Sequence, residues 1–323
     1  MSDSKWRSAG LGGPLPLSTR RLLLPLAVLA LLAALIASQS GPAQLAHATP
    51  STPTATTIVV KPSTMSRTPA DPTAWCFYDD DNDANPCSGS GQMVTGPGTA
   101  PIGTGSAAMT VGVSTGRQDI LTWQFNDVAL SSITTLTYQA RSTSSSGNNN
   151  VFLQFNTDFG NSGGAWQGRL SFSPSTSSFT SNTWQTWDAA SDTAGVWYTS
   201  KSINSDDGHN TVAPCDITTS GCTWSQVKSY WPNAKIGNPS NPGDGALLFR
   251  VGNPGGDYTG NVDAFHIVTN ALDETFDFDP DNFCTTTCYV DASAVGTGDG
   301  QQESPFSTIS AALSHVATNG TIH

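Results

Sequence analysis

Residues 135–141 read TLTYQAR, and in this stretch Leu136, Tyr138 and Ala140 alternate with polar neighbours. Side chains two residues apart lie on the same face of a β-strand, so the stretch predicts a strand with one apolar face. The same alternation recurs on both sides of it along the chain. The segments that show it are Leu121, Trp123 and Phe125; Val151, Leu153 and Phe155; Leu170 and Phe172; Leu247, Phe249 and Val251; and Asp263, Phe265 and Ile267.

Polar loops rich in Gly, Ser and Asn, such as 142–150 and 160–164, separate these segments. Short alternating segments between turn clusters predict an all-β fold, an antiparallel β-sandwich over residues 73–270. One helix is expected within it, at Thr223–Tyr230, because Trp224, Val227 and Trp231 follow helical spacing and Pro232 ends the run. The two Trp side chains are expected to face the core.

The composition agrees with a loop-rich β-protein. Of the 323 residues, 37% are hydrophobic and only 12% are charged, with 31 Gly and 20 Pro. Coiled coils and helix bundles need more Ala, Glu, Lys and Leu, so both are excluded. Nine Trp are too many for a disordered chain. The length favours two folded units with some unstructured chain.

The N-terminal 48 residues are expected to be a signal peptide. Leu22–Ala37 is an apolar run behind Arg20 and Arg21, and Pro25 interrupts it early. Cleavage is expected after Ala48, with Ser40 as the alternative and a twin-arginine route as a second possibility for export. The protein is therefore expected to be secreted or extracellular, with membrane contact only through an uncleaved leader. Residues 49–72 are predicted to be a Thr/Ser/Pro-rich linker that holds one strand at Thr57–Lys61.

The charge of the chain excludes one class of partner. The formal net charge is −12. Removing the four basic residues and the one acidic residue of the leader leaves 9 basic and 24 acidic residues, a charge near −15. Nucleic acid needs clustered Lys and Arg and is not an expected partner.

All six cysteines follow the leader, in a compartment where disulfides form. Their grouping along the chain favours the pairs Cys76–Cys87, Cys215–Cys222 and Cys284–Cys288. The alternative, a metal site, has no Cys-x-x-Cys motif and no clustered His to support it.

Three stretches of residues 73–270 resemble the jelly-roll modules of secreted bacterial proteins, an architecture shared with many carbohydrate-binding modules. They are WCFYD at 75–79, the stretch from VTGPG at 94–98 to GTGSA at 103–107, and GNVDAF at 260–265. The resemblance implies a jelly-roll sandwich. Its implied partner is a polysaccharide or another cell-surface component, although this architecture serves many functions.

The C-terminal residues resemble a second family. An acidic hinge is expected over 271–287. Residues 288–323 then combine a strand at Tyr289–Ala292, a Gly/Asp-rich loop and an amphipathic helix with Ser304 as N-cap and Pro305 at its first position. The predicted apolar stripe is Phe306, Ile309, Leu313 and Val316, ending at Asn319 and Gly320.

This pattern resembles the entrance of the right-handed parallel β-helix, or pectate-lyase-like, fold. The resemblance implies the N-terminal cap of a truncated β-helix domain in a longer secreted protein. The catalytic residues of such lyases lie in coils that are not part of this sequence, so no catalytic residue is carried over.

Two acidic stretches have the alternating spacing of oxygen ligands for Ca²⁺. They are Asp79, Asp81 and Asp83, and Asp277, Asp279 and Asp281. Ala84 replaces the required Gly, which rejects an EF-hand. A solvated acidic turn is the alternative for both. The jelly-roll resemblance implies a structural calcium between the opening segment and the strand that holds Asp263.

Aromatic side chains in polar surroundings are the candidates for stacking on sugar rings. They are Trp166, Trp184, Trp187, Trp197 and Tyr258. Filling of the sandwich core is the alternative for each of them. Trp166 and Tyr258 lie in glycine-rich loops and are the least typical of a core.

Three functions remain open from the sequence. The first is a non-catalytic, exported module that binds carbohydrate or the cell surface, ahead of a β-helix domain acting on polysaccharide. The second is a structural or adhesive surface protein, and the third is a hydrolase or lyase within this chain. An exposed row of aromatic side chains would favour the binding module. Complete burial of the Trp side chains would favour the structural or adhesive protein, and a cleft with two close carboxylates would favour the hydrolase or lyase.

Overall fold

The structure is a computed structural model. It describes residues 53–323 except for 66–70, 72, 81–86, 88, 113–115, 145–149, 161–163, 202–213, 218–219, 242, 253–256, 282–283, 285, 295–297 and 303. The predicted leader lies outside the described residues. Among those that are described, no helix is long and apolar enough to cross a membrane.

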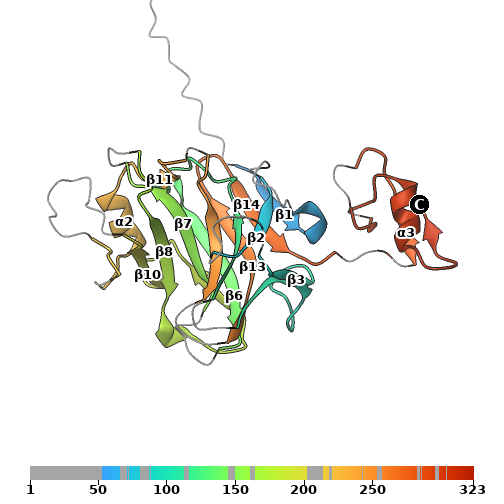
Figure 1. Ribbon diagram of the computed structural model, residues 1–323, viewed down its shortest axis with the longest axis horizontal. Helices are drawn as coiled ribbons and strands as arrows, with labels where there is room; N and C mark the ends of the chain where they lie inside the picture. Colours follow the sequence, from blue (N-terminus) through green and yellow to red (C-terminus); the bar gives the residue numbers. More distant parts are fainter. Residues whose placement is uncertain are drawn as a thin grey trace, which may run out of the picture. The chain divides into compact units, whose positions relative to one another are not determined.

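Two seven-stranded sheets dominate the fold (Figure 1). In the first, sheet A, the long strand β13 (Tyr258–Val268) is central and pairs with three others. The remaining strands of sheet A are β1 (Ala55–Val60), β3 (Gln92–Thr95), β4 (Gly105–Val111), β6 (Thr135–Ser142), β9 (Gln185–Asp188) and β14 (Asp273–Phe278).

Sheet B is antiparallel, in the order β10-β8-β7-β12-β5-β2, and β11 (Lys235–Ile236) adds to β7. Figure 1 shows β10, β8 and β7 side by side. The strands of sheet B are β2 (Trp75–Tyr78), β5 (Arg117–Thr122), β7 (Phe152–Asp158), β8 (Arg169–Pro174), β10 (Gly195–Thr199) and β12 (Leu247–Gly252). Short 3₁₀ turns occur at Pro62–Thr64, Leu130–Ser132 and Thr176–Ser178.

The core lies between the two sheets and is rich in aromatic rings. Trp75 contacts Phe249 of sheet B and Phe265, Phe276 and Phe278 of sheet A, with ring centroids 5.0–6.3 Å apart. Burying one such side chain stabilises the folded state by about 1.5–3 kcal/mol relative to leaving it exposed. Because two sheets enclose one core, the predicted β-sandwich is confirmed.

Alternation predicted the inward faces of most strands correctly, as in β6, where Leu136, Tyr138 and Ala140 are buried in the core. It was wrong for Leu121 and Trp123, because β5 turns Ile120 toward the core and ends at Thr122. Leu121 and Trp123 belong instead to a second buried group, the outer cluster, on the opposite face of sheet B. Its members are Cys76, Tyr78, Leu121, Trp123, Ala246 and Leu248.

A bulge in β13 also departs from strict alternation. The register shifts between Asp263 and His266, and Ala264 has φ 49°. Before the bulge, β13 pairs with β4 on one side; after it, β14 takes that place. The bulge is one extra residue, so Asp263 and Phe265 point to different faces although they are two residues apart.

The predicted helix is confirmed as α2 (Trp224–Tyr230). Thr223 is its N-cap and accepts a hydrogen bond from the backbone N–H of Gln226, whose side chain bonds back to Thr223. Trp224, Val227 and Trp231 are buried, as expected.

All three predicted disulfides, Cys76–Cys87, Cys215–Cys222 and Cys284–Cys288, are present, and no cysteine is free. Each closes a loop of at most 11 residues, so each fixes a local turn. The disulfides are compatible with an extracellular protein.

Two predicted boundaries are wrong. The expected linker contains β1, close to the strand expected at Thr57–Lys61. The expected acidic hinge contains β14, which pairs antiparallel with β13 and parallel with β1. Phe276 and Phe278 place one apolar face of β14 in the core, so the acidic residues beside them do not make this segment a hinge.

The C-terminal segment has a small core of its own. Strands β15 (Thr287–Cys288) and β16 (Thr321–Ile322) pair in parallel, and α3 spans Ile309–His315. The predicted N-cap was wrong: Thr308, not Ser304, accepts a hydrogen bond from the backbone N–H of Ala311. Because the helix begins four residues later, its buried residue is Ala312, while Ile309 and Leu313 are exposed.

Candidate functional site

A cavity of about 660 Å³ lies on the outer face of sheet B, the face opposite the core. We call it the arginine pocket. Its lining residues come mostly from the outward positions of β7, β8, β10 and β12 and from flanking loops, although Phe172 and Thr199 are buried at inward positions. They are Asp80, Arg117, Phe152, Gln154, Trp166, Arg169, Ser171, Phe172, Ser173, Tyr198, Thr199, Ser200, Ile217, Arg250 and Gly252.

The pleat of the strands explains why these residues face outward. In β8, Leu170 and Phe172 are buried in the core, and the residues between and beside them, Arg169, Ser171 and Ser173, turn to the pocket. The neighbouring strands repeat this pattern. The sheet therefore supplies the pocket with a polar floor above an apolar core.

A network of ion pairs crosses the floor. Arg250 donates from Nε and Nη2 to the two carboxylate oxygens of buried Asp119, at 2.7 and 2.8 Å. Asp80 accepts from Arg169 at 2.9 Å and lies 2.6 Å from Arg250 Nη2 and 3.6 Å from Arg117 Nη1. Three guanidinium groups thus share two carboxylates.

This network determines the charge states of its acids. Burial alone would raise the pKa of Asp80, but the hydrogen bond from Arg169 and the charge of Arg250 outweigh it and hold that pKa below its usual value. Burial raises the pKa of Asp119, against the charge of Arg250. Burial alone would lower the pKa of the Arg250 guanidinium. The negative charge of Asp119 outweighs this effect and raises that pKa above its usual value.

Trp166 forms part of the rim and is 38% exposed. The Lys201 ammonium lies 4.4 Å from the centre of the indole ring and donates to the Trp166 backbone carbonyl at 3.0 Å. On the floor, Gln154 donates from Nε2 to Ser171 Oγ at 2.8 Å, while its Oε1 is buried without a hydrogen-bond partner. The pocket combines an aromatic face with a buried acceptor that has unused capacity.

The structure places the five predicted sugar-stacking residues in different environments. Trp166 lines the arginine pocket. Trp184 is half-buried and donates from Nε1 to the Pro97 carbonyl at 3.0 Å. Trp187, Trp197 and Tyr258 are buried in the core, so as stacking platforms they were predicted wrongly.

Trp187 packs in the core although its Nε1 has no hydrogen-bond partner there. The polar ends of the other two side chains have partners. Trp197 donates from Nε1 to the Ala189 carbonyl, and the hydroxyl of Tyr258 accepts from the backbone N–H of Gly252. These polar ends are satisfied inside the protein, which lets the rings fill the core.

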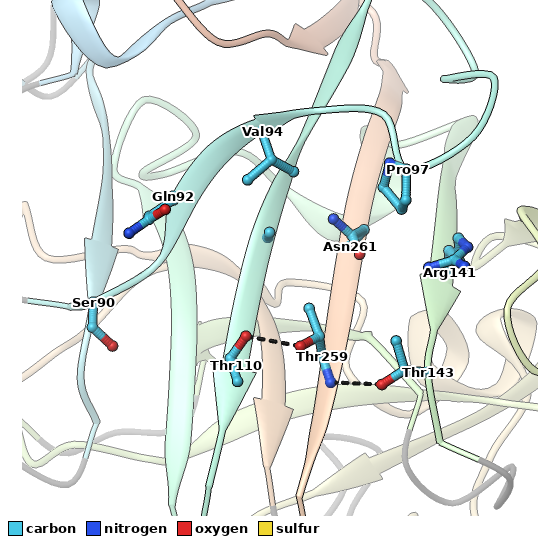
Figure 2. A pocket seen from close by; sticks show the side chains of 10 residues that line it. Ser90, Gln92, Val94, Pro97, Thr110, Arg141, Thr143, Thr259 and Asn261 are labelled. Carbon is cyan, nitrogen blue, oxygen red and sulfur yellow. Dashed lines mark hydrogen bonds between the residues drawn. The ribbon is translucent and has the colours of Figure 1, made fainter.

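A second cavity, of about 510 Å³, lies on the outer face of sheet A, and we call it the threonine pocket (Figure 2). It is lined by Ser90, Gln92, Val94, Pro97, Ala108, Thr110, Arg141, Thr143, Thr259 and Asn261. Thr110 and Thr259 share a hydrogen bond of 2.8 Å, and the backbone N–H of Thr259 donates to Thr143 Oγ1 at 2.9 Å. None of these described lining residues is aromatic, so the threonine pocket offers no ring for stacking.

The four predicted calcium ligands belong to two segments of the chain. Asp81 and Asp83 lie outside the described residues, and Asp79 follows β2 of sheet B while Asp263 belongs to β13 of sheet A. Asp263 accepts from the backbone N–H groups of Phe278 and Ile102, at 2.9 and 3.2 Å. In the described part of the chain, no three His, Cys, Asp or Glu side chains group as a metal site.

Asp263 instead belongs to what we call the acidic junction, made of Asp263, Asp277, Asp279 and Gly103, where β14 takes the place of β4 beside β13. Gly103 has φ 56°, and a Cβ built there would lie 2.5–2.7 Å from carboxylate oxygens of Asp277 and Asp279. Asp277 Oδ1 is buried without a hydrogen-bond partner. Two carboxylates therefore converge on a space that only glycine leaves open.

Two of the three buried acids of the junction, Asp263 and Asp277, hold their protons more strongly than usual. Burial raises the pKa of Asp263 to about 7 despite its backbone hydrogen bonds. Burial and then the charge of Asp279 raise the pKa of Asp277 to about 6, with Lys61 acting in the opposite direction.

The arginine pocket offers no pair of acids for glycoside hydrolysis. Of the described residues that line it, Asp80 is the one carboxylate, and it is kept ionised by its arginines. Such hydrolysis needs one acid that is protonated near neutral pH and a second carboxylate nearby.

Comparison with known proteins gives no family. No family model matches the chain, and no curated protein matches it. Two solved structures are similar over part of the chain. One is described as TmCBM61 in complex with beta-1,4-galactotriose, with 8% identity, a TM-score of 0.24, and coverage of 62% of this chain and 90% of that one. The other is SGBP-B from a complex xyloglucan utilization locus in Bacteroides uniformis, with 14% identity, a TM-score of 0.26, and coverage of 55% and 47%. TM-scores this low carry no information about function.

Proposed function

We propose that this protein contains an exported, non-catalytic jelly-roll module that binds carbohydrate through the arginine pocket, ahead of a β-helix domain acting on polysaccharide. The observation that carries the proposal is the exposed Trp166 ring beside a polar floor. Sugar rings present C–H groups that pack on an indole face, and hydroxyl groups that need hydrogen-bond partners.

The floor supplies those partners. Gln154 donates from Nε2 to Ser171 Oγ and so holds that hydroxyl in position on the floor. The serine hydroxyls of β8 and the guanidinium groups donate to sugar oxygens. Six of the eight Trp in the described part of the chain are buried, so the binding surface depends on Trp166.

Replacement of Trp166 by alanine is expected to weaken glycan binding at least about 10-fold, because an aromatic side chain on which a ligand stacks contributes roughly 2 kcal/mol or more to binding. A glycan array followed by calorimetry on the best polysaccharide measures the change. Trp184→Ala is the matched control, since Trp184 contacts Pro97 outside this pocket. If the array shows no binding at all, the carbohydrate proposal is wrong and the structural or adhesive role is favoured.

The C-terminal segment supports the proposed β-helix domain. Strands β15 and β16 pair in parallel, and a second parallel bridge joins Val290 to Phe306. Parallel pairing of short strands with an intervening helix suits the first coil of a β-helix with its cap. The exposed Ile309 and Leu313, one turn apart on α3, are an apolar face that such a cap would carry against a further layer.

We also propose a structural calcium at the acidic junction. Asp277 and Asp279 would hold it, because hard carboxylate oxygens suit Ca²⁺ and the orphaned Asp277 Oδ1 needs a partner. The ion would neutralise the repulsion between the two carboxylates. It would thereby stabilise the junction between β4 and β14.

In the presence of a chelator, the free energy of unfolding is expected to fall as the pH rises from about 4 to about 7, by roughly 1–3 kcal/mol. The pKa of Asp277 is about 6 in the folded protein and 3.8 in the unfolded reference. The folded chain therefore binds the extra proton below pH 6, and the stabilisation that this proton gives is lost above it. Asp263, with its pKa near 7, acts in the same direction. Urea denaturation at several pH values measures this dependence.

The control variant is Asp277→Asn, in which the part of the pH dependence due to this residue disappears. Millimolar Ca²⁺ at pH 8 is expected to raise the melting temperature of the unsubstituted chain and to have much less effect on Asp279→Asn. A melting temperature that is the same with Ca²⁺ and with chelator would remove the calcium proposal.

A further inference from the structure

The arginine pocket is lined by apolar side chains that the protein itself leaves exposed. In the part of the chain that the structure describes, the exposed large apolar side chains are Val59, Trp166, Ile217, Ile309 and Leu313. Two of them, Trp166 and Ile217, line this one pocket. Ile217 is 72% exposed, so a ligand in the pocket has apolar surface to cover. Exposed apolar side chains that meet at one cavity are typical of a binding site.

The loop that carries Ile217 is anchored at both ends to strand β10. At one end, the backbone N–H of Thr199 donates to the Cys215 carbonyl at 2.8 Å. At the other end, Trp197 and Cys222 exchange two backbone hydrogen bonds of 2.8 and 2.9 Å. A disulfide joins Cys215 to Cys222 and closes the loop. Ile217 is therefore presented to the pocket by a short loop that is fixed to sheet B.

Two serine hydroxyls of the same pocket are oriented by the protein as hydrogen-bond donors. Ser171 Oγ accepts from Gln154 Nε2 at 2.8 Å, and Ser200 Oγ accepts from the backbone N–H of Arg169 at 2.8 Å. Neither hydroxyl donates to another described residue, so each keeps its hydrogen for an acceptor on a ligand. A carbonyl oxygen is such an acceptor and brings no donor of its own.

We propose that the arginine pocket selects sugars that carry acetyl groups, with Ile217 in contact with the acetyl methyl, an inference that rests on the proposed function. An acetyl group joins a methyl to a carbonyl, and the pocket offers an exposed isoleucine for the first and serine donors for the second. O-acetyl esters and N-acetyl amides share this chemistry. A sugar hydroxyl placed against isoleucine would lose water without gaining a hydrogen bond.

The test compares sugars that differ in their acetyl groups alone. The full chain is titrated by calorimetry with neutral acetylated xylo-oligosaccharides and with the same oligosaccharides after removal of the esters by alkali. A second pair compares chitotetraose with cellotetraose, in which hydroxyls replace the acetamido groups. All four ligands are uncharged, so differences in ligand charge do not enter. We expect at least about 5-fold tighter binding of the acetylated member, because burial of one methyl alone is worth about 4-fold.

Variants at two exposed isoleucines separate a specific contact from general stickiness. Ile217→Ser is expected to reduce the ratio to about twofold or less, because the methyl contact is lost. Ile217→Val keeps a branched apolar side chain and is expected to retain the preference. Ile309→Ser is the matched control, since Ile309 lies on α3 and is 62% exposed, and it is expected to leave the ratio unchanged. Circular dichroism checks that each variant is folded.

The outcomes separate this inference from the proposed function. A preference in the xylan pair alone identifies esters as the ligand, and one in the chitin pair alone identifies amides. Equal binding within both pairs, lost in Trp166→Ala, overturns the selection for acetyl groups and leaves carbohydrate binding intact. A preference that survives in Ile217→Ser, or that falls equally in Ile309→Ser, also overturns the inference. Binding of none of the four ligands, together with a blank glycan array, overturns both proposals.

Discussion

Replacement of Asp119 by alanine is expected to lower the free energy of unfolding by about 3–5 kcal/mol, because it leaves a buried arginine without its main partner. Asp119 is fully buried, and Arg250 is nearly so. The two N–H donors of Arg250 that now bond Asp119 would face a cavity. Asp80 lies 2.6 Å from Arg250 Nη2 and still pairs with it in the variant. The loss of stability is therefore expected toward the lower end of this range. Guanidinium denaturation followed by Trp fluorescence measures the change.

The control for this prediction removes both charges at once. In the double variant Asp119→Leu with Arg250→Met, no buried charge is left unpaired, and stability is expected to recover to within about 1–2 kcal/mol of the unsubstituted chain. If Asp119→Ala is as stable as the unsubstituted chain, the pair does not hold the floor of the pocket together. The double variant is also expected to bind glycan poorly, because Arg250 lines the pocket.

Trp197→Ala is expected to lower the free energy of unfolding by about 3–5 kcal/mol, since it opens a large cavity in the core. The indole of Trp197 is fully buried and packs on Phe155, Phe172 and Trp224, with ring centroids 5.0–5.4 Å apart. It joins β7, β8 and α2 into one cluster. Thermal and denaturant unfolding both report the loss.

Two variants sharpen the interpretation. Trp197→Phe keeps most of the ring but leaves the Ala189 carbonyl without its indole N–H donor, so a smaller loss is expected. Trp184→Ala changes a half-buried indole and is expected to destabilise by less than half as much. A loss at Trp197 no larger than that at Trp184 would contradict the role of the aromatic cluster.

The sandwich could be predicted because its strands repeat one local rule. In β6, β7, β8 and β12 the apolar residues alternate, and each predicted inward residue is buried. Alternation failed at β5, which keeps its register but turns Leu121 to the outer cluster. It also failed in β13 at Ala264, where a bulge adds a residue, and nothing in the local sequence marks that position.

The edge of sheet A was missed for a different reason. Residues 273–278 read DETFDF, and their acidic character suggested a hinge. Phe276 and Phe278 alternate as strand residues do, but the acidic residues around them are more typical of an exposed segment. The pairing of β14 with β1, more than 200 residues away along the chain, is a long-range contact that local patterns do not encode.

The candidate site could be predicted only in part. Trp166 stood out because glycines surround it. Trp187 and Trp197 have similar polar neighbours, yet their sheets turn them inward. Arg250 interrupts the apolar run LLFRVG, which was a usable signal for a functional or paired charge, but its partners Asp80 and Asp119 become visible only when β12 lies beside β5.

The outer cluster has a consequence for how the arginine pocket would bind the proposed ligand. Strands β5 and β12 contribute Leu121 and Leu248 to that cluster at one end and Arg117 and Arg250 to the pocket at the other. These two strands are covered on both faces where the cluster lies, which restricts their motion. The floor of the pocket is therefore preorganised, and a ligand needs to immobilise little beyond the side chains at the rim. Affinity at such a site is not reduced by the entropy of ordering a flexible loop floor, so even a small oligosaccharide can be held with useful strength.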